Sequence, residues 1–422
     1  MLNLPVKVEP NDIVEKGTGC PETYQSSGWN LLAEDISFPA AVIHARALEN
    51  NARWMQTFSE KAKVKLAPHG KTTMSPELFH LQMQQGCWGM SLATVPQVVT
   101  AYHSGIKRII LANQLVGRRH YEIIADLLKK GGLEFYCFVD SIENAKSLGA
   151  FFSAKNIRLN ILLEIGVVGG RCGWRDTHNI MKLCDVINQY DALQLCGISF
   201  YEGVIHGENA EREIIAFVKL ITRLCEHLYE KRVFSTDDII VTGAGSAWYD
   251  LVSQHLHSHY RQIEFTPIIR PGCYLIHDTG IYQDAQRAVL ERSELACQLS
   301  LEEAGQLESS LSLWAYVQSV PEPGLVIVGM GKRDVAFDAG LPTPELHFRP
   351  GMPAPVKSAA EWKVTKIMDQ HCMMSTSAEA DLKPGDLLSF STSHPCLTMD
   401  KWRFIGVMDD NYMIRQHITT YF

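Results

Sequence analysis

Eight short apolar segments alternate with amphipathic segments between residues 64 and 270, and this alternation constrains the fold more than any other feature of the chain. The apolar segments have the length of strands, and the stretches between them have helical periodicity. Eight parallel strands with intervening helices over about 200 residues are typical of a (β/α)8 barrel. The predicted strands cover residues 64–68, 88–93, 107–112, 133–140, 157–165, 193–200, 238–243 and 264–270.

The pattern changes after Arg270. Strand-like runs such as LSLWAYVQSV, GLVIVGMG and FIGVMDD are separated by Pro and Gly, without long helical periodicity, which predicts a β domain. The first residues of the chain have little regular pattern, and we expect them to pack against this second domain. The predicted division is therefore a barrel over residues 38–275 and a β domain formed by residues 1–37 together with 276–422.

The composition indicates a globular protein that binds a small molecule. Of the 422 residues, 46% are hydrophobic and 20% are charged. The net charge of −8 and pI near 6.1 provide no basic surface for a nucleic acid. The chain lacks a signal-peptide pattern and an apolar run long enough to span a bilayer, so we expect a cytoplasmic protein without membrane contact. The eleven cysteines include no CxxC pair, and most are expected to be reduced, buried thiols.

Functional groups of such a barrel lie on the loops that follow the strands. The motif PHGKTT places Lys71 after the first strand, where its amine could form a Schiff base with a carbonyl. The loop GVVGGRCGW places Arg171 after the fifth strand, where a guanidinium could bind a phenolate or carboxylate. Tyr201 follows the sixth strand. Taken singly, these residues also fit a solvated lysine, an ordinary glycine-rich turn and an aromatic side chain that seals the core.

The loops after the seventh and eighth strands predict an anion site. In VTGAGSAWYD, Gly243, Gly245 and Ser246 offer free backbone N–H groups and a hydroxyl before a helix. In RPGCYLIHD, Tyr274 could add a second hydroxyl. Barrels of this kind favour phosphate at these two loops. A lysine, an arginine and a phosphate site around one barrel mouth together fit pyridoxal 5'-phosphate.

A possible metal site lies near the C-terminus, in SHPCLTMDKW. His394 and Cys396 are suitable ligands for a soft metal, but no second pair stands nearby. Structural zinc sites are closed by four protein ligands, whereas catalytic sites keep a position open. The pair therefore favours a catalytic metal, and the alternative is a turn histidine beside a buried thiol.

These motifs resemble those of the fold-type III pyridoxal-phosphate enzymes, in particular the D-serine dehydratase and D-threonine aldolase group, from about residue 38 to the C-terminus. The resemblance implies an alanine-racemase-like barrel followed by a β domain, and a homodimer. By the same resemblance, Lys71 forms the Schiff base with the cofactor, Arg171 lies beside its ring oxygen, Tyr201 lines it, Gly243, Gly245, Ser246 and Tyr274 hold its phosphate, and His394 and Cys396 bind a divalent metal.

Two positions need comment. The first motif of the family usually has arginine before its proline, and Ala67 stands there in this chain. His371 falls where related enzymes carry a histidine close to the metal, so it is either part of the metal site or a buried structural histidine.

The expected activity is pyridoxal-phosphate- and metal-dependent dehydration of a D-β-hydroxy amino acid, with D-serine giving pyruvate and ammonia. Lys71 would remove the α-proton, and the metal would assist departure of the β-hydroxyl. Thiolate and imidazole ligands favour zinc, with manganese as the alternative metal. The alternative functions are a metal-dependent D-threonine aldolase and a non-catalytic protein of pyridoxal-phosphate homeostasis.

Overall fold

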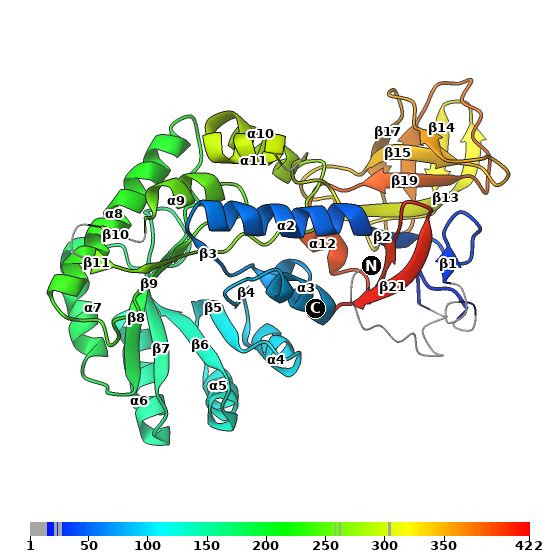
Figure 1. Ribbon diagram of the computed structural model, residues 1–422. Helices are drawn as coiled ribbons and strands as arrows, with labels where there is room; N and C mark the ends of the chain where they lie inside the picture. The colour runs from blue at the N-terminus through cyan, green and yellow to red at the C-terminus, as the bar shows by residue number, and fades with distance from the viewer. Residues whose placement is uncertain (1–14, 21–22, 24–27, 258, 261–262, 303–304) are drawn as a thin grey trace.

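The structure is a computed structural model that describes residues 15–20, 23, 28–257, 259–260, 263–302 and 305–422. An eight-stranded parallel sheet forms the first part of the chain, in the order β3-β12-β9-β8-β7-β6-β5-β4 (Figure 1). The edge strands β3 and β4 are joined by backbone bonds from Trp88 N–H to Leu66 and from Ser91 N–H to Pro68, which close the sheet into a barrel. The strands are β3 (Lys65–Leu66), β4 (Met90–Leu92), β5 (Arg108–Gln114), β6 (Glu134–Val139), β7 (Leu159–Ile165), β8 (Leu193–Phe200), β9 (Ile240–Gly243) and β12 (Thr266–Ile269).

All eight predicted barrel strands are confirmed, and helices cover the outside of the sheet. The Ser75 hydroxyl accepts a hydrogen bond from the Leu78 N–H and caps the start of the helix Pro76–Gln84. The helices are α2 (Ala45–Lys61), α3 (Pro76–Gln84), α4 (Val95–His103), α5 (Arg118–Lys130), α6 (Ile142–Lys155), α7 (Ile180–Ile187), α8 (Ala210–Glu230) and α9 (Tyr249–His255). Single 3-10 turns, η2 (Gly70–Thr72) and η3 (Thr177–Asn179), follow β3 and β7, and β10 (His259–Tyr260) pairs with β11 (Ile263–Glu264).

The second part of the chain is a mostly antiparallel sheet with the principal order β1-β21-β20-β2-β13-β14-β18-β17. Strand β19 pairs with β13 and β15, and β16 extends β15. The expected C-terminal β domain is therefore confirmed as a fold class. Its elements are β1 (Trp29–Asn30), β2 (Ala40–His44), β13 (Leu311–Glu322), β14 (Leu325–Val328), β15 (Thr343–Phe348), β16 (Val356–Lys357), β17 (Lys363–Ile367), β18 (Cys372–Ser375), β19 (Leu387–Ser391), α12 (Cys396–Met399), β20 (Phe404–Met408) and β21 (Met413–Thr419).

The structure differs from the predicted division at two places. Strand β2 is hydrogen-bonded to β13 and β20, although the expected boundary at residue 38 placed it in the barrel. The apolar run AAVIH is buried in either sheet, so its sequence pattern does not reveal which sheet it joins. The chain also forms two helices, α10 (Ile281–Arg292) and α11 (Glu294–Glu302), before the β domain resumes at β13. Helix α11 packs against α2.

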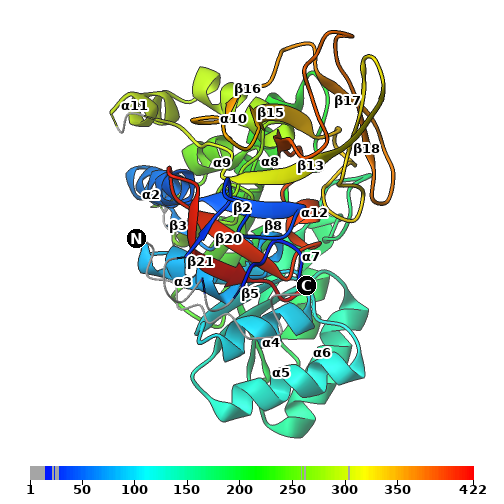
Figure 2. The same ribbon diagram turned by 90° about the vertical axis from the view of Figure 1, so that its right-hand side faces the viewer.

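The two parts meet through segments that are distant in sequence. Figure 2 shows β2, β20 and β21 side by side, with the barrel helices α4, α5 and α6 below them. Strand β21 packs against α3, and α12 packs against η2. The C-terminal strands thus bring α12 to the end of the barrel where the strands finish. Within the described ranges, no helix combines the length and apolar character needed to cross a bilayer.

Candidate active site

A cavity of about 560 Å³ lies at the carboxyl ends of the barrel strands, within the size range of small-molecule sites. Most of its wall comes from loops of the barrel, and α12 and the residues just before it supply another part. The structure brings seven of the predicted site residues to this one cavity: Lys71, Arg171, Tyr201, Gly245, Ser246, His394 and Cys396.

Lys71 reaches the cavity because the chain turns sharply after β3. It lies in the single turn η2, and the preceding Gly70 fits tightly against the barrel wall. A Cβ at Gly70 would lie only 2.7 Å from the Phe79 side chain and 2.9 Å from that of Leu92. Glycine therefore lets the turn settle into the barrel wall, with the Lys71 side chain directed into the cavity.

His69 also lines the cavity, next to Lys71. His69 is partly exposed, but its Nδ1 atom is buried and has no hydrogen-bond partner in the protein. Burial, reinforced by the neighbouring cations, holds the pKa of His69 well below its usual value, so the ring is neutral. A buried polar atom without a partner is costly, and its position on the cavity wall fits contact with a bound polar ligand.

Two arginines make this end of the barrel positive. The Arg171 guanidinium lies 4.0 Å from the centre of the Tyr201 ring, a cation–π contact. Arg270 is buried and donates from Nη2 to the Phe200 carbonyl at 2.7 Å. Burial lowers the pKa of Arg270 to about 10, which leaves it charged at neutral pH. Together with Lys71, these side chains favour an anionic ligand.

The loops after β9 and β12 direct backbone N–H groups toward acceptors. Ala244 and Gly245 donate to the two carboxylate oxygens of Glu202, at 3.0 and 2.7 Å. Gly272 and Cys273 donate to the Ser246 hydroxyl oxygen, at 3.2 and 3.1 Å. The loop after β9 therefore binds an anion, and in this structure that anion is the chain's own carboxylate. Burial raises the pKa of Glu202, and the hydrogen bonds from the Gly245 and Ala244 N–H groups oppose part of that shift.

Two residues predicted to hold a phosphate do not reach the cavity. Tyr274 is buried, and its hydroxyl accepts a hydrogen bond from Gln82 Nε2 at 2.9 Å, on the side facing α3. Gly243 is a packing glycine, because a Cβ there would lie 2.3 Å from the Phe200 ring. The neighbours Gly272 and Cys273 face the cavity instead. His371 is also outside the site: it is exposed in the turn between β17 and β18, and is therefore not a buried structural histidine either.

The predicted metal ligands lie on the side of the cavity formed by the β domain. His394 Nδ1 lies 2.7 Å from an Asp338 carboxylate oxygen, which leaves Nε2 as the ring nitrogen available to a metal. Burial raises the pKa of Asp338, but the hydrogen bond and charge of His394 outweigh it, and the pKa is lowered overall. The arrangement of imidazole, carboxylate and thiol fits a divalent metal that accepts soft ligands.

Cys396 has a second thiol beside it. Its Sγ atom lies 3.5 Å from Cys273 Sγ and donates to the Thr72 hydroxyl at 3.4 Å. The hydrogen bond from Cys396 lowers the pKa of Cys273 to about 6, and the same contact together with burial raises the pKa of Cys396. The two thiols are therefore close enough to hydrogen-bond to each other, and their pKa values shift in opposite directions.

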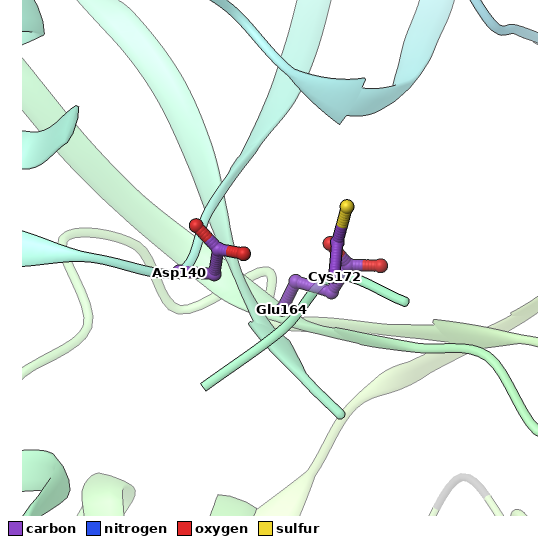
Figure 3. A group of neighbouring side chains, drawn as sticks. All are labelled: Asp140, Glu164 and Cys172. Atoms are coloured by element: carbon purple, nitrogen blue, oxygen red, sulfur yellow. The ribbon is translucent and has the colours of Figure 1, made fainter. Parts of the chain in front are cut away.

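A separate group of potential metal-binding side chains lies on the Arg171 side of the cavity. The ligand atoms of Asp140, Glu164 and Cys172 are all within 4.8 Å of one another (Figure 3). Its carboxylates have partners already, since Asp140 accepts from the Gly173 N–H at 2.8 Å and Glu164 accepts from the Gln114 side chain. Burial raises the pKa of Glu164. We interpret this group as a hydrogen-bonded polar wall.

Sequence reasoning missed several residues of the site. His69 and Cys273 lie within the motifs PHGKTT and RPGCYLIHD, so their positions after barrel strands were a usable signal. Arg270 ends the eighth predicted strand and could have been found in the same way. Asp338 had no such signal, because it is 56 residues from His394 and its position depends on the folding of the β domain.

Comparisons with known proteins identify the family of the chain. The chain matches the family described as "Alanine racemase, N-terminal domain" over residues 43–255, more than half of its length, and "Putative serine dehydratase domain" over residues 310–408. It is 24% identical to a D-threonine aldolase from Arthrobacter sp over 363 residues, which are 85% of this chain and 86% of that protein.

Solved structures show the same fold. The crystal structure of a D-threonine aldolase from Filomicrobium marinum has a TM-score of 0.74 at 21% identity, covering 93% of this chain and 97% of that chain. D-threo-3-hydroxyaspartate dehydratase from Delftia sp. HT23 has a TM-score of 0.72 at 18% identity, covering 93% and 99%. A cysteine-to-alanine variant of a D-threo-3-hydroxyaspartate dehydratase has been solved in a metal-free form. These similarities confirm the expected barrel and C-terminal β domain.

Proposed function

Because the chain belongs to the alanine-racemase-like family of fold-type III pyridoxal-phosphate enzymes, we propose that it is a metal-dependent dehydratase of D-β-hydroxy amino acids. The observation that supports this most directly is the composition of one cavity wall. Lys71 from the barrel and the pair His394 and Cys396 from the β domain line the same cavity. A lysine suited to Schiff-base chemistry and a potential metal site therefore act on the same small volume.

The residues present fit pyridoxal phosphate. We assign Lys71 to its aldehyde, Arg171 to its ring oxygen, and the Gly245 and Ser246 loop to its phosphate, with Tyr201 lining the site. The cationic side chains Lys71, Arg171 and Arg270 and the unpartnered Nδ1 of His69 support a polar, anionic ligand. When bound, the cofactor delocalises the electron pair that proton removal leaves on the substrate α-carbon.

Each group of the chain has a defined task in this reaction. The Lys71 amine removes the α-proton of the substrate, as a general base placed at the cavity wall. The neutral His69 ring offers a hydrogen-bond partner without adding charge. His394 and Cys396 would hold the divalent metal, which would supply Lewis-acid assistance to departure of the β-hydroxyl. Asp338 binds Nδ1 of His394, which leaves Nε2 as the nitrogen that would bind the metal.

We propose D-serine as the preferred substrate, with pyruvate and ammonia as products. Asp400 lines the cavity one helical turn after Cys396 and is paired with Lys401 at 3.4 Å, so this part of the wall offers no free cation to a second substrate carboxylate. The lysine and arginine side chains on the wall are Lys71, Arg171 and Arg270, and the last is already bonded to the Phe200 carbonyl. The charges of the wall therefore fit a small, neutral β-hydroxy side chain.

The second candidate function is an aldolase, favoured by the likeness to a D-threonine aldolase over 85% of this chain. An aldolase would use the same lysine and metal, but would cleave the bond between the α- and β-carbons and release glycine and an aldehyde. A non-catalytic role in cofactor homeostasis would require neither His394 nor Cys396. The homodimer expected from the family stays a prediction.

The deciding experiment measures the products of the purified chain loaded with pyridoxal phosphate and zinc. D-serine, D-threonine and D-threo-3-hydroxyaspartate are supplied, with the L-isomers as controls, and keto acid and aldehyde are quantified separately. We expect pyruvate from D-serine, no product after chelation, and recovery with zinc. Aldehyde with glycine would establish the aldolase instead, and the absence of product from every D-isomer would leave the binding protein.

A further inference from the structure

We propose that Cys273 is a third protein ligand of the divalent metal, so that the metal site consists of His394, Cys396 and Cys273 with one position open for the substrate. This inference rests on the proposed function, and it assigns a role to a residue outside the predicted metal pair. The likeness to the family supplies two ligands, whereas the structure places a second thiol beside one of them.

The distance between the two sulfurs suits a shared metal ion. Cys273 Sγ and Cys396 Sγ are 3.5 Å apart. Two thiolates bound to one zinc ion at about 2.3 Å, with tetrahedral geometry, are separated by ~3.8 Å. To bind one ion, the two sulfurs would therefore move apart by only about 0.3 Å from their positions in this structure.

The backbone around Cys273 is held firmly in place. Its N–H group and that of Gly272 both donate to the Ser246 hydroxyl oxygen. Gly272 also packs against the loop after β3, since a Cβ at Gly272 would lie 2.6 Å from the His69 carbonyl oxygen. Cys273 is buried and directs its sulfur toward Cys396, with the Thr72 hydroxyl within 3.6 Å. A ligand held this way needs little reorganisation when the metal binds.

His394 would complete the set after its ring turns toward the two sulfurs. In this structure the His394 ring is not within 4.8 Å of both sulfurs. Among the described residues, the one group of three potential ligands with all atoms that close is Asp140, Glu164 and Cys172. Its side chain retains 24% of its exposure, which leaves it room to turn. The hydrogen bond from Nδ1 to Asp338 keeps Nε2 as the free nitrogen.

Three protein ligands would have two consequences for the site. Two thiolates and an imidazole select zinc over magnesium or manganese, which prefer oxygen ligands. Three ligands with one open position are the pattern of catalytic zinc sites, whereas two ligands alone would hold the ion weakly. The ligands come from both domains, so the bound metal also joins the loop after β12 to α12.

The test uses cobalt(II) in place of zinc, because thiolate-to-cobalt charge-transfer absorption reports the number of bound sulfurs. The full chain loaded with pyridoxal phosphate is compared with C273S, C396S and the control C297S, whose cysteine is exposed on α11. We expect the charge-transfer intensity to fall by about half in C273S and in C396S, and to be unchanged in C297S. Zinc affinity, measured by chelator competition, falls on the order of tenfold or more in C273S.

The possible outcomes distinguish failure of the three-ligand site from failure of the proposed dehydratase function. Unchanged cobalt absorption in C273S, with complete loss in C396S, would overturn the three-ligand site while leaving the two-ligand dehydratase intact. No cobalt absorption in the wild-type chain, together with metal-independent activity, would remove the proposed metal function itself. The purified wild-type chain could instead have two fewer titratable thiols than the reduced chain and bind cobalt only after reduction. The two sulfurs would then form a redox pair, and this result would also overturn the inference. Retained cofactor absorption in each variant confirms that it is folded.

Discussion

The contact between Asp338 and His394 allows a prediction that distinguishes a metal-orienting role from a structural one. The two roles differ in how much the free energy of unfolding and the zinc affinity should change. The change is D338N, which keeps the shape of the side chain and removes its charge. The two side chains are 24% and 42% exposed, and an ion pair this accessible contributes only about 0.2–1 kcal/mol to folding stability. We therefore expect the free energy of unfolding of the metal-free chain to change by less than about 1 kcal/mol.

The effect on metal binding should be larger. A carboxylate that orients a histidine ligand typically changes metal affinity by about 10–100-fold, equivalent to ~1.4–2.7 kcal/mol. The assay is competition with a zinc chelator at fixed pH, alongside chemical denaturation without metal. The control is D369N, whose carboxylate is 72% exposed and paired with Arg333 away from the cavity. Zinc affinity of D338N equal to that of D369N would refute the orienting role.

Three further changes test the packing and electrostatics of the site. G272A is expected to lower the free energy of unfolding by about 1–3 kcal/mol, because its Cβ would lie 2.6 Å from the His69 carbonyl oxygen; an unchanged melting temperature would contradict this packing. Y274F should cost about 1–3 kcal/mol by leaving Gln82 Nε2 without its acceptor, while cofactor affinity is unchanged; a large loss of affinity would return Tyr274 to the phosphate site. Stability should fall as pH drops below 6.5, because burial lowers the pKa of His277 to about 4, so the unfolded chain binds a proton that the folded chain excludes. Between pH 6.5 and about 4 this histidine contributes a slope of up to ~1.4 kcal/mol per pH unit, and denaturation of H277Q should lack that part of the slope.

The barrel was predictable because its signals are local. Each strand is a short apolar run that a helical segment follows, and the chemistry sits where a run ends. Lys71, Arg171 and Tyr201 were found by that rule, and the structure brings all three to one cavity. His394 and Cys396 were found from their chemical type, which says what they bind but not which partners stand beside them.

The parts that sequence could not predict depend on direction and on distant contacts. Cys273 and Tyr274 are adjacent, yet the thiol faces the cavity and the phenol faces α3. Strand β2 directly precedes the barrel helix α2, yet it joins the other sheet. Its partners in β13 are 268 or more residues away along the chain, so the local sequence does not reveal this pairing. The segment of α10 and α11 was predicted as part of the β domain.

The covalent attachment of the cofactor tests the central claim most directly. The chain is loaded with pyridoxal phosphate, reduced with borohydride, digested and analysed by mass spectrometry. We predict a single modified peptide that carries the reduced cofactor on Lys71, and no such adduct in K71A. An adduct on a different lysine, or an unmodified Lys71 in the fully loaded protein, would contradict the account.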